Sequence, residues 1–341
     1  MRKSLLALLL LAVSGLTHAE VQLKQGHPES YTVVKGDTLW AISGKFLTSP
    51  WKWPELWHAN PQIKNPHLIY PGDTLSLIYV DGKPRLTLTR GASRGTVKLS
   101  PKIRSTSAAE AIPTIPLEAI NGFLLRNRII DKEAEYTKAP YVLGGQKESI
   151  LAGIGDRIYT KGKLEEGTIY NIFRLGKVYK DPKTKEFLGI NLDDMGSGEV
   201  IAMDGDVGSV NLIRSTQEIQ PADRLFITEE RAVTSIFVPS EPKQVIDGVI
   251  LDVPRGVTQV GTMDVVTINK GAREQLEEGN VLSIYRRGEL IRDRVSGKLV
   301  KAPDEKAGLM MVFRVYDKIS YALVLHSTQP LRVNDVVKNP R

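Results

Sequence analysis

The sequence of 341 residues contains no cysteine, and this absence removes several classes of chemistry at once. A chain without thiols cannot form disulfides, thiolate metal sites, a cysteine nucleophile or a lipid anchor attached through cysteine. Histidine is also scarce, and His27, His58, His67 and His326 show no H-x-x-x-H or H-x-H spacing that would hold zinc. The folded state must therefore be stabilised by burial of apolar side chains.

Long apolar runs are also missing, apart from one at the start of the chain. Arg2 and Lys3 precede the run Leu5–Val13, and small residues end it at Thr17-His18-Ala19. This pattern predicts a Sec-type signal peptide over residues 1–19, cleaved after Ala19. Because no other stretch approaches the length that a membrane-spanning helix needs, we expect a mature periplasmic protein with no membrane span.

The formal net charge is +7, but the excess of basic residues is concentrated in one short segment. Residues 81–106 hold seven Lys and Arg against one acid, Asp81, among Thr, Ser and Gly. Such a segment could bind an acidic polymer or lipid headgroups, and the simpler interpretation is a solvated strand and tether. For an exported protein with this distribution of charge, we expect no nucleic-acid partner.

Composition divides the rest of the chain into a small unit, a linker and a long β region. Residues 31–78 form the small unit, and residues 79–116, basic and then rich in Ser, Ala and Pro, are typical of a strand followed by a linker. From residue 117 onward, runs of Val, Ile, Tyr and Phe are broken by Gly, Asp and Pro at regular intervals. This spacing predicts a mostly β region.

The β region repeats itself when Leu164 is aligned with Leu276 and the chain is read onward without a gap. Identical segments recur in this alignment, namely LEEG at 164–167 and 276–279, and STQ at 215–217 and 327–329. The repeat predicts two copies of one β unit, residues 117–238 and 239–341. The segments DPKTKEFLG and DRVSGKLV, which begin at Asp181 and Asp293, are expected to be hairpin tips.

All four tryptophans of the chain lie close together, at Trp40, Trp51, Trp53 and Trp57. A small unit without cysteine has difficulty burying enough apolar surface, and each Trp can bury about 150–250 Å². We therefore expect Trp40 and Trp57 to be core residues. Two alternatives stay open for Trp51 and Trp53, which are either packed or form an exposed aromatic platform for a glycan or a partner.

The small unit is predicted to contain a strand, two helices and a final strand, in that order. Tyr31–Val34 and Thr74–Ile78 have the composition of strands. Asp37 or Thr38 can cap a first helix, because their side chains accept hydrogen bonds from free backbone N–H groups. Pro54 suits the first turn of a second helix, where a missing N–H is tolerated.

These residues resemble a LysM domain. The resemblance rests on YTVVKGDTLWAIS from Tyr31, on Leu56 followed by Asn60, and on LIYPGDTLSL from Leu68. LysM domains have a βααβ fold and bind the N-acetylglucosamine backbone of peptidoglycan or chitin. The resemblance implies a glycan site made by two turns, one with Gly36, Asp37, Thr38 and Leu39 and the other with Leu68, Ile69, Tyr70, Pro71 and Gly72.

One stretch departs from the LysM pattern. The span from Ile42 to Asn60 is longer than in that family by a few positions, and the extra positions include Trp51 and Trp53. The predicted chemistry also fits without the family resemblance. A glycan rich in N-acetyl groups offers amides and hydroxyls for backbone hydrogen bonds and C–H faces for apolar contact, and no titrating residue is required.

The sequence does not show the residues of a wall-degrading enzyme. Without cysteine there is no papain-like amidase, and the histidine spacing gives no zinc peptidase. The paired carboxylates of a glycosidase stay open as an alternative. The pairs Asp193-Asp194 and Asp204-Gly205-Asp206 lack the full pattern of a calcium loop. We expect a protein that is not an enzyme and has no cofactor or metal.

The whole arrangement is that of an α+β protein, with a βααβ domain followed by a mostly β region of two repeated units. It resembles the LysM-bearing, type IV pilus secretin-associated (TsaP) family, whose C-terminal part is likened to the flagellar protein FlgT. Beyond the LysM residues, the resemblance rests on APYVLGGQKESILAGIGDRIYTKG from Ala139. It implies a periplasmic accessory that ties the outer-membrane secretin to peptidoglycan. A peptidoglycan hydrolase or hydrolase activator, and a general or flagellar envelope scaffold, stay open as alternatives.

Overall fold

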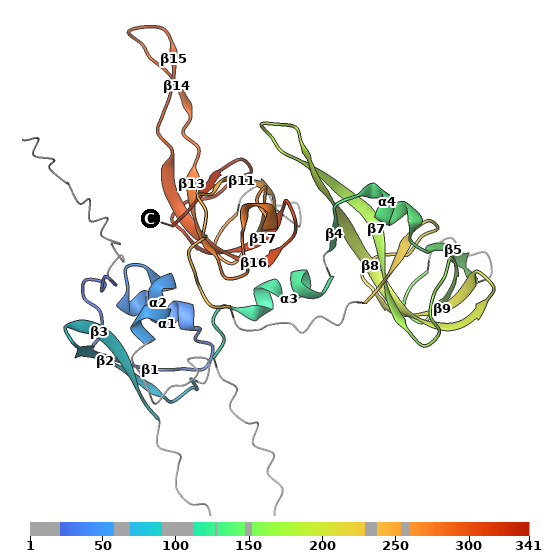
Figure 1. Ribbon diagram of the computed structural model, residues 1–341, viewed down its shortest axis with the longest axis horizontal. Helices are drawn as coiled ribbons and strands as arrows, with labels where there is room; N and C mark the ends of the chain where they lie inside the picture. The colour runs from blue at the N-terminus through green and yellow to red at the C-terminus, as the bar shows by residue number, and fades with distance from the viewer. Residues whose placement is uncertain are drawn as a thin grey trace, which may run out of the picture. The chain divides into compact units, whose positions relative to one another are not determined.

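The computed structural model describes residues 21–57, 69–90, 112–126, 128–146, 152–228, 237–253 and 260–340. Two compact units, residues 1–112 and 113–341, make up the chain (Figure 1). The predicted signal peptide, Leu68 and Asn60 lie outside the described residues, as does most of the predicted linker, residues 91–111. No helix among the described residues is long and apolar enough to cross a membrane.

The N-terminal unit has the predicted order of strand, helix, helix and strand, and a further strand follows. Its sheet is antiparallel, with the order β1–β2–β3. The elements are β1 (Ser30–Thr32), α1 (Leu39–Phe46), the 3₁₀ helix η1 (Pro50–Lys52), α2 (Trp53–Trp57), β2 (Thr74–Val80) and β3 (Lys83–Thr89). The two helices pack on one another and on the sheet around a single apolar core.

Helix α1 begins where the sequence predicts it. The Thr38 hydroxyl accepts a hydrogen bond from the Ala41 N–H at 3.1 Å and so caps the first turn. Leu39, Ile42 and Phe46 recur at helical spacing and are all buried, because this spacing places them on one face. The helix ends at Leu47, whose backbone is extended.

The tryptophans belong to the core of this unit. Trp53 is 1% exposed and Trp51 8%, so neither ring is available as an exposed aromatic platform. Trp51 lies in η1 and Trp53 begins α2, and both side chains are buried. Trp53 and Trp57 meet edge to face, with ring centroids 6.3 Å apart. Of the two alternatives for Trp51 and Trp53, the structure therefore shows packing in the core.

Part of the basic segment is packed against this unit. Strand β3 pairs along its whole length with β2, and its Leu86 and Leu88 enter the core on alternate positions. Ile112 also joins this core, and its N–H donates to the Ile69 carbonyl at 2.8 Å. Composition predicted a strand followed by a linker. The strand is β3, and it forms the edge of the sheet β1–β2–β3 instead of acting as a tether.

The C-terminal unit is mostly β. It begins with α3 (Leu117–Arg126), β4 (Arg128–Ile130) and α4 (Glu133–Lys138). The first repeat holds β5 (Tyr141–Gly145), β6 (Arg157–Lys161), β7 (Ile169–Lys180), β8 (Phe187–Asp204), β9 (Val207–Ser215) and β10 (Arg224–Ile227). The second holds β11 (Asp247–Asp252), β12 (Val265–Ile268), the 3₁₀ helix η3 (Ala272–Glu274), β13 (Val281–Arg286), β14 (Leu290–Arg292), β15 (Leu299–Lys301), β16 (Glu305–Val315), β17 (Ser320–Ser327) and β18 (Val336–Lys338).

Each repeat closes into a ring of six antiparallel strands. In the second repeat, the closed barrel has the order β11–β12–β17–β16–β13–β18. In the first, the pairing of β8 with β9 closes the ring β5–β6–β9–β8–β7–β10, and β4 pairs with β8 outside it. The strands correspond one to one, so the two rings have the same topology, and we call them the first and the second barrel. The core clusters of the two repeats lie within these rings.

Backbone hydrogen bonds recur in the predicted alignment of the two repeats. The Gly167 N–H donates to the Val200 carbonyl at 2.8 Å, and in the second repeat the Gly279 N–H donates to the Val312 carbonyl at 2.7 Å. In the same way, the Thr216 N–H donates to the Met195 carbonyl and the Thr328 N–H to the Ala307 carbonyl, both at 2.8 Å. In the first strands the alignment shifts. The bridge Ala152–Ile219 of the first repeat corresponds to the bridge Val260–Leu331 of the second. Leu331 is the residue that the alignment pairs with Ile219. Val260, however, lies earlier in the chain than the residue that the alignment pairs with Ala152. The shift falls at η3, which the first repeat lacks.

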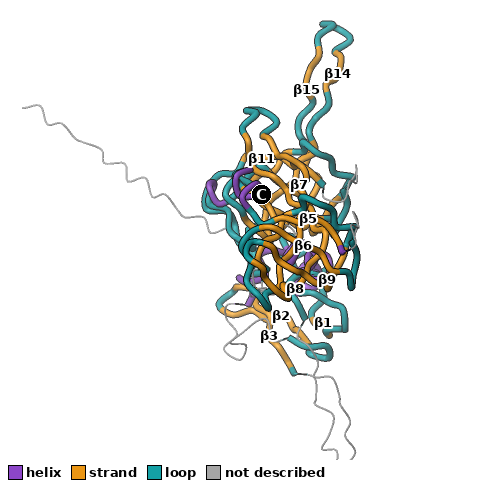
Figure 2. Tube along the Cα trace, turned by 90° about the vertical axis from the view of Figure 1, so that its right-hand side faces the viewer, coloured by secondary structure: helices purple, strands orange, loops and turns teal. Residues whose placement is uncertain are grey.

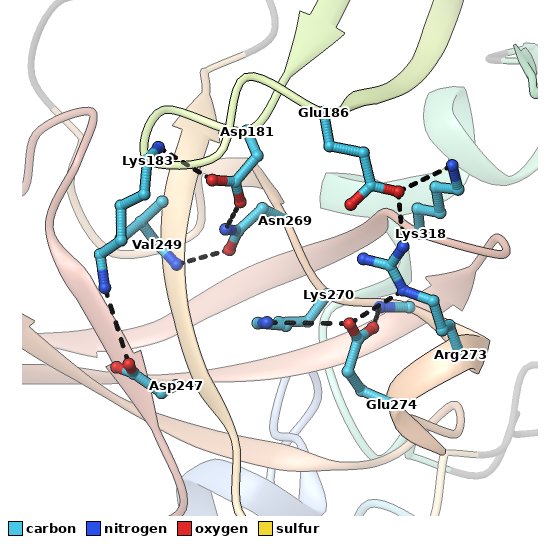
Figure 3. Close-up of polar contacts among 11 residues, drawn as sticks. Asp181, Lys183, Glu186, Asp247, Val249, Asn269, Lys270, Arg273, Glu274 and Lys318 are labelled. Atoms are coloured by element: carbon cyan, nitrogen blue, oxygen red, sulfur yellow. Dashed lines mark hydrogen bonds and ion pairs between the residues drawn. The ribbon is translucent and has the colours of Figure 1, made fainter.

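The hairpin of β7 and β8 extends beyond its own ring and lies against the second barrel (Figure 3). At its tip, the Asp181 carboxylate accepts a hydrogen bond from the Asn269 side-chain amide at 2.7 Å. The Asn269 carbonyl oxygen accepts the Val249 N–H at 2.7 Å, which fixes the orientation of that amide. Glu186 pairs with Arg273 at 2.7 Å and with Lys318 at 2.9 Å. This contact joins the two repeats.

The surroundings of Asp181 stabilise its charged form. Burial acts to raise the pKa of this carboxyl group, but hydrogen bonds from the Thr184 N–H, the Asn269 amide and the Lys183 N–H outweigh burial and lower the pKa to about 2. The stabilisation that this charge provides is therefore fully present above pH 3.8, the ordinary value, and is lost as the pH falls toward 2.

We expect Asp181→Asn to lower the free energy of unfolding of the C-terminal unit by about 1–3 kcal/mol near neutral pH, because an amide cannot replace both acceptor oxygens. The difference between the wild type and the variant should shrink as the pH falls from 3.8 to about 2. Calorimetric unfolding of the full chain measures both effects.

Asp293→Asn is the matched control, because Asp293 accepts the Val295 N–H at 2.8 Å as Asp181 accepts the Lys183 N–H, but at the tip of β14–β15. It should cost less than Asp181→Asn. Equal losses from the two variants, or a loss from Asp181→Asn that does not change with pH, would contradict the assigned role of Asp181.

Candidate glycan-binding site

The two turns implied in glycan binding lie side by side. Strands β1 and β2 pair Thr32 with Thr74, so the turn that follows β1 and the turn that precedes β2 meet at the same end of the sheet. Val33 joins them with two backbone hydrogen bonds. Its N–H donates to the Asp73 carbonyl and its carbonyl accepts the Gly72 N–H, both at 2.8 Å.

The first turn is held by the carboxylate of Asp37. It accepts the Val34 N–H at 2.9 Å and the Tyr31 hydroxyl at 3.0 Å. Burial, the hydrogen bond to Asp37 and the charge of Asp37 all raise the pKa of Tyr31, so its hydroxyl stays a donor. Gly36 has a φ of 94°, a conformation that glycine adopts without strain, and its Cα is open to solvent.

The second turn repeats the design of the first. The carboxylate of Asp73 accepts the Tyr70 N–H at 3.0 Å, as Asp37 accepts the N–H three residues before it. Gly72 has a φ of 98°, and it precedes Asp73 as Gly36 precedes Asp37. Asp73 also pairs with Arg90 at 2.8 Å, and the Arg90 guanidinium lies 5.4 Å from the centre of the Tyr70 ring.

Comparison with known proteins agrees with this geometry. Residues 31–77 match the LysM domain family. This part of the chain is a LysM domain. An uncharacterised protein, YqbP, of Bacillus subtilis (strain 168) is 40% identical over 60 residues, which are 15% of this chain and 27% of that protein. LysM domains generally bind peptidoglycan, which is consistent with a binding role for this domain.

The residues expected at the site of the LysM domain fall into two groups. Thr38, Leu39 and Ile69 are buried and hold the turns in place. Gly36, Pro71 and Gly72 are exposed, and Asp37 and Tyr70 are partly exposed, so these five form the accessible surface of the two turns. Leu68, the remaining expected residue, lies outside the described part of the chain.

Three residues that position the LysM turns were not singled out from the sequence. Val33 connects the turns through its backbone, Asp73 orders the second turn, and Arg90 pairs with Asp73 from beyond the last expected strand. The triplet Gly-Asp-Thr, which occurs at 36–38 and again at 72–74, was the signal for Asp73. Nothing in the sequence signalled Arg90, because its role depends on the pairing of β3 with β2.

The chemistry of this surface suits a neutral polymer. The two turns expose Gly36, Pro71 and Gly72 near the partly exposed Tyr70. Exposed turn backbone near an aromatic ring suits a ligand with amides, hydroxyls and C–H faces. Within the described residues, no three His, Asp or Glu side chains gather as a metal site. The surface can therefore hold a glycan through hydrogen bonds and ring contact.

Asp73→Ala should destabilise the LysM domain by about 1–3 kcal/mol, because it leaves the Tyr70 N–H and Arg90 without their acceptor. All four tryptophans lie in this domain, so their fluorescence reports its unfolding within the full chain during denaturant titration. Glu29→Ala, at an exposed position just before β1 in the same unit, is the control and should have little effect. An unchanged midpoint for Asp73→Ala would show that Asp73 does not order the turn.

Proposed function

We propose that this protein is a non-catalytic, periplasmic, peptidoglycan-binding accessory that ties the outer-membrane secretin of a type IV pilus to the cell wall. The observation that carries the binding half is the juxtaposition of the two Gly-Asp-Thr turns through Val33, with their outer surfaces exposed. The resemblance of the chain to the secretin-associated family supports the second half.

The LysM domain supplies the contact with glycan. N-acetylglucosamine units present an amide and several hydroxyls, which the exposed backbone groups around Gly36 and Gly72 can bind. Tyr70 offers a ring face for the C–H groups of a sugar, and Arg90 holds that ring from one side. No proton transfer is needed for this contact, which is why the proposal is binding without cleavage.

The two barrels supply the second contact. They are built twice from one topology and joined by the β7–β8 hairpin, so they offer a large protein surface linked to one glycan-binding domain. A weak LysM contact becomes effective when the same molecule is also bound to an oligomeric pore, because linkage raises the effective concentration. A secretin under the force of a pilus would gain an attachment to the wall in this way.

The glycan half is tested with purified sacculi. The exported chain should sediment with sacculi, and Tyr70→Ala should weaken this binding by about 3-fold to 10-fold, a loss of about 1 kcal/mol. Tyr79→Ala is the matched control, because Tyr79 is 63% exposed and lies on β2, seven positions beyond Gly72. Its variant should bind as the wild type does.

The same incubation tests the absence of catalysis. We expect no release of soluble muropeptides from labelled sacculi. Release of muropeptides would replace the proposal with a peptidoglycan hydrolase, and equal sedimentation of the wild type and Tyr70→Ala would place the glycan contact away from the second turn.

The protein half is tested by site-specific photo-crosslinking in intact envelopes. A photoreactive residue at Ile213 or Val333, which are exposed on the first and second barrel, should capture the secretin. The same residue at Tyr79 of the LysM domain should not. If neither barrel position yields the secretin and other envelope proteins are captured instead, the role is that of a general or flagellar scaffold.

A further inference from the structure

The two repeats carry equivalent hairpins that differ in what covers them. The tip of β7–β8 lies against the second barrel, whereas β14–β15 projects from its own barrel (Figures 1 and 2). The turns themselves are alike. Asp181 and Asp293 each accept the N–H two residues ahead at 2.8 Å, and the N–H of each donates to the carbonyl five residues ahead, at 2.9 Å and 2.8 Å.

The projecting hairpin exposes apolar side chains where its equivalent buries them. Tyr179 is 3% exposed and Leu188 is 1% exposed. In the alignment of the repeats these positions become Ile291 and Val300, which are 59% and 53% exposed. Leu290, Leu299 and Val295 on the same hairpin are exposed as well, Val295 at 98%. Apolar exposure on this scale, concentrated on one hairpin, is typical of a protein contact.

The second barrel receives the first hairpin at a site that we call the seat. It consists of the start of β11, the end of β12 and the turn between β16 and β17, represented by Asp247, Asn269 and Lys318. The topology of the first barrel places Ala139, Lys161 and Asp206 at the equivalent positions. Side chains of Lys161 and Asp206 are 50% and 65% exposed, so this equivalent seat is accessible at both.

The chemistry of the second hairpin matches the seat of the first barrel at three of the contacts that the first hairpin makes. Glu186 pairs with Lys318 in the observed contact, and the equivalent residues, Lys298 and Asp206, have both charges reversed. Asp181 contacts Asn269. The residues equivalent to these two are Asp293 and Lys161, whose charges are opposite to one another. Lys183 lies near Asp247, and both equivalents, Val295 and Ala139, are apolar. These three contacts have compatible replacements, whereas the Glu186–Arg273 pair has none, because Arg273 belongs to η3.

We propose that the β14–β15 hairpin of one molecule docks on the first barrel of a second copy, as β7–β8 docks on the second barrel within one molecule. Residues 290–301 carry four basic side chains against one acidic one. The receiving end of the first barrel holds Asp204, Asp206 and Glu166 together with Lys161 and Lys163, and Lys161 is the residue that the one acidic side chain, Asp293, would meet. Charge complementarity thus favours the same orientation. The exposed Lys161–Asp206 pair, at 3.8 Å, is a weak interaction that docking would replace.

This contact is heterologous, because the hairpin of one copy meets a different surface of the next. Such contacts build a closed ring when the rotation between copies closes, and a filament when it does not. Every copy in the assembly carries its own LysM domain, so self-association presents several glycan-binding domains on one body. The proposal concerns the barrels alone and does not depend on the partner to which the protein binds.

The first test compares two valines of nearly equal exposure. Val295 is 98% exposed at the hairpin tip, and Val245 is 93% exposed away from the hairpin. Sedimentation equilibrium of the exported full chain should show a mass that rises with protein concentration. Val295→Asp should weaken this association about 10-fold or more, and Val245→Asp should leave it unchanged, because only Val295 is buried by docking. A chain that stays monomeric up to its solubility limit, or equal behaviour of the two variants, would overturn the proposal.

The second test exchanges the charges of one predicted pair. Lys298→Glu and Asp206→Lys should each weaken association about 5-fold, because each places like charges together. An equimolar mixture of the two variants should recover association, since each hairpin then meets an oppositely charged residue on the other variant. Recovery in the mixture identifies the pair. If the single variants lose association and the mixture does not recover it, the hairpin meets a different surface.

Discussion

Closure of a six-stranded ring is the constraint on which the larger part of this chain depends. A sheet that closes has no exposed edge, and its inward side chains form a core without help from disulfides, which this sequence cannot make. The chain meets the constraint twice with the same strand order. Strands β7 and β8 are longer than the ring requires, with 12 and 18 residues, and the excess length forms the hairpin that reaches the second barrel.

The two repeats are alike in topology and unlike in what they contact. The first hairpin contacts Asn269, Arg273 and Lys318 of its own chain. Of these, Arg273 belongs to η3, which the first repeat lacks. The second hairpin has no such seat after it in the described chain and presents Ile291, Val295 and Val300 to solvent. The duplicated unit thus makes one contact within the molecule, through β7–β8, and leaves the equivalent hairpin β14–β15 exposed. The N-terminal domain adds a small surface of two turns, so the proposed glycan contact and the proposed protein contacts belong to one chain.

The sequence predicted the elements of the LysM domain because local chemistry fixes them. Thr38 caps α1 as expected, and the two Gly-Asp-Thr turns lie where their φ > 0 glycines place them. It predicted the repeat where LEEG and STQ recur, but not its first strands, where the insertion that contains η3 shifts the alignment. Ring closure was not predicted, since alternating apolar residues indicate strands and not their partners. The burial of Trp51 and Trp53 could not be decided either, because the same residue type suits a core and a platform.

The central claim is that glycan binds at the two turns joined by Val33. Hydrogen–deuterium exchange of the full chain, with and without a soluble oligomer of N-acetylglucosamine, measures this at the backbone groups themselves. The account predicts slower exchange confined to residues 33–38 and 69–73, with the barrel strands unchanged. Protection that appears only in the barrels, or no change in either turn at saturating oligomer, would contradict it.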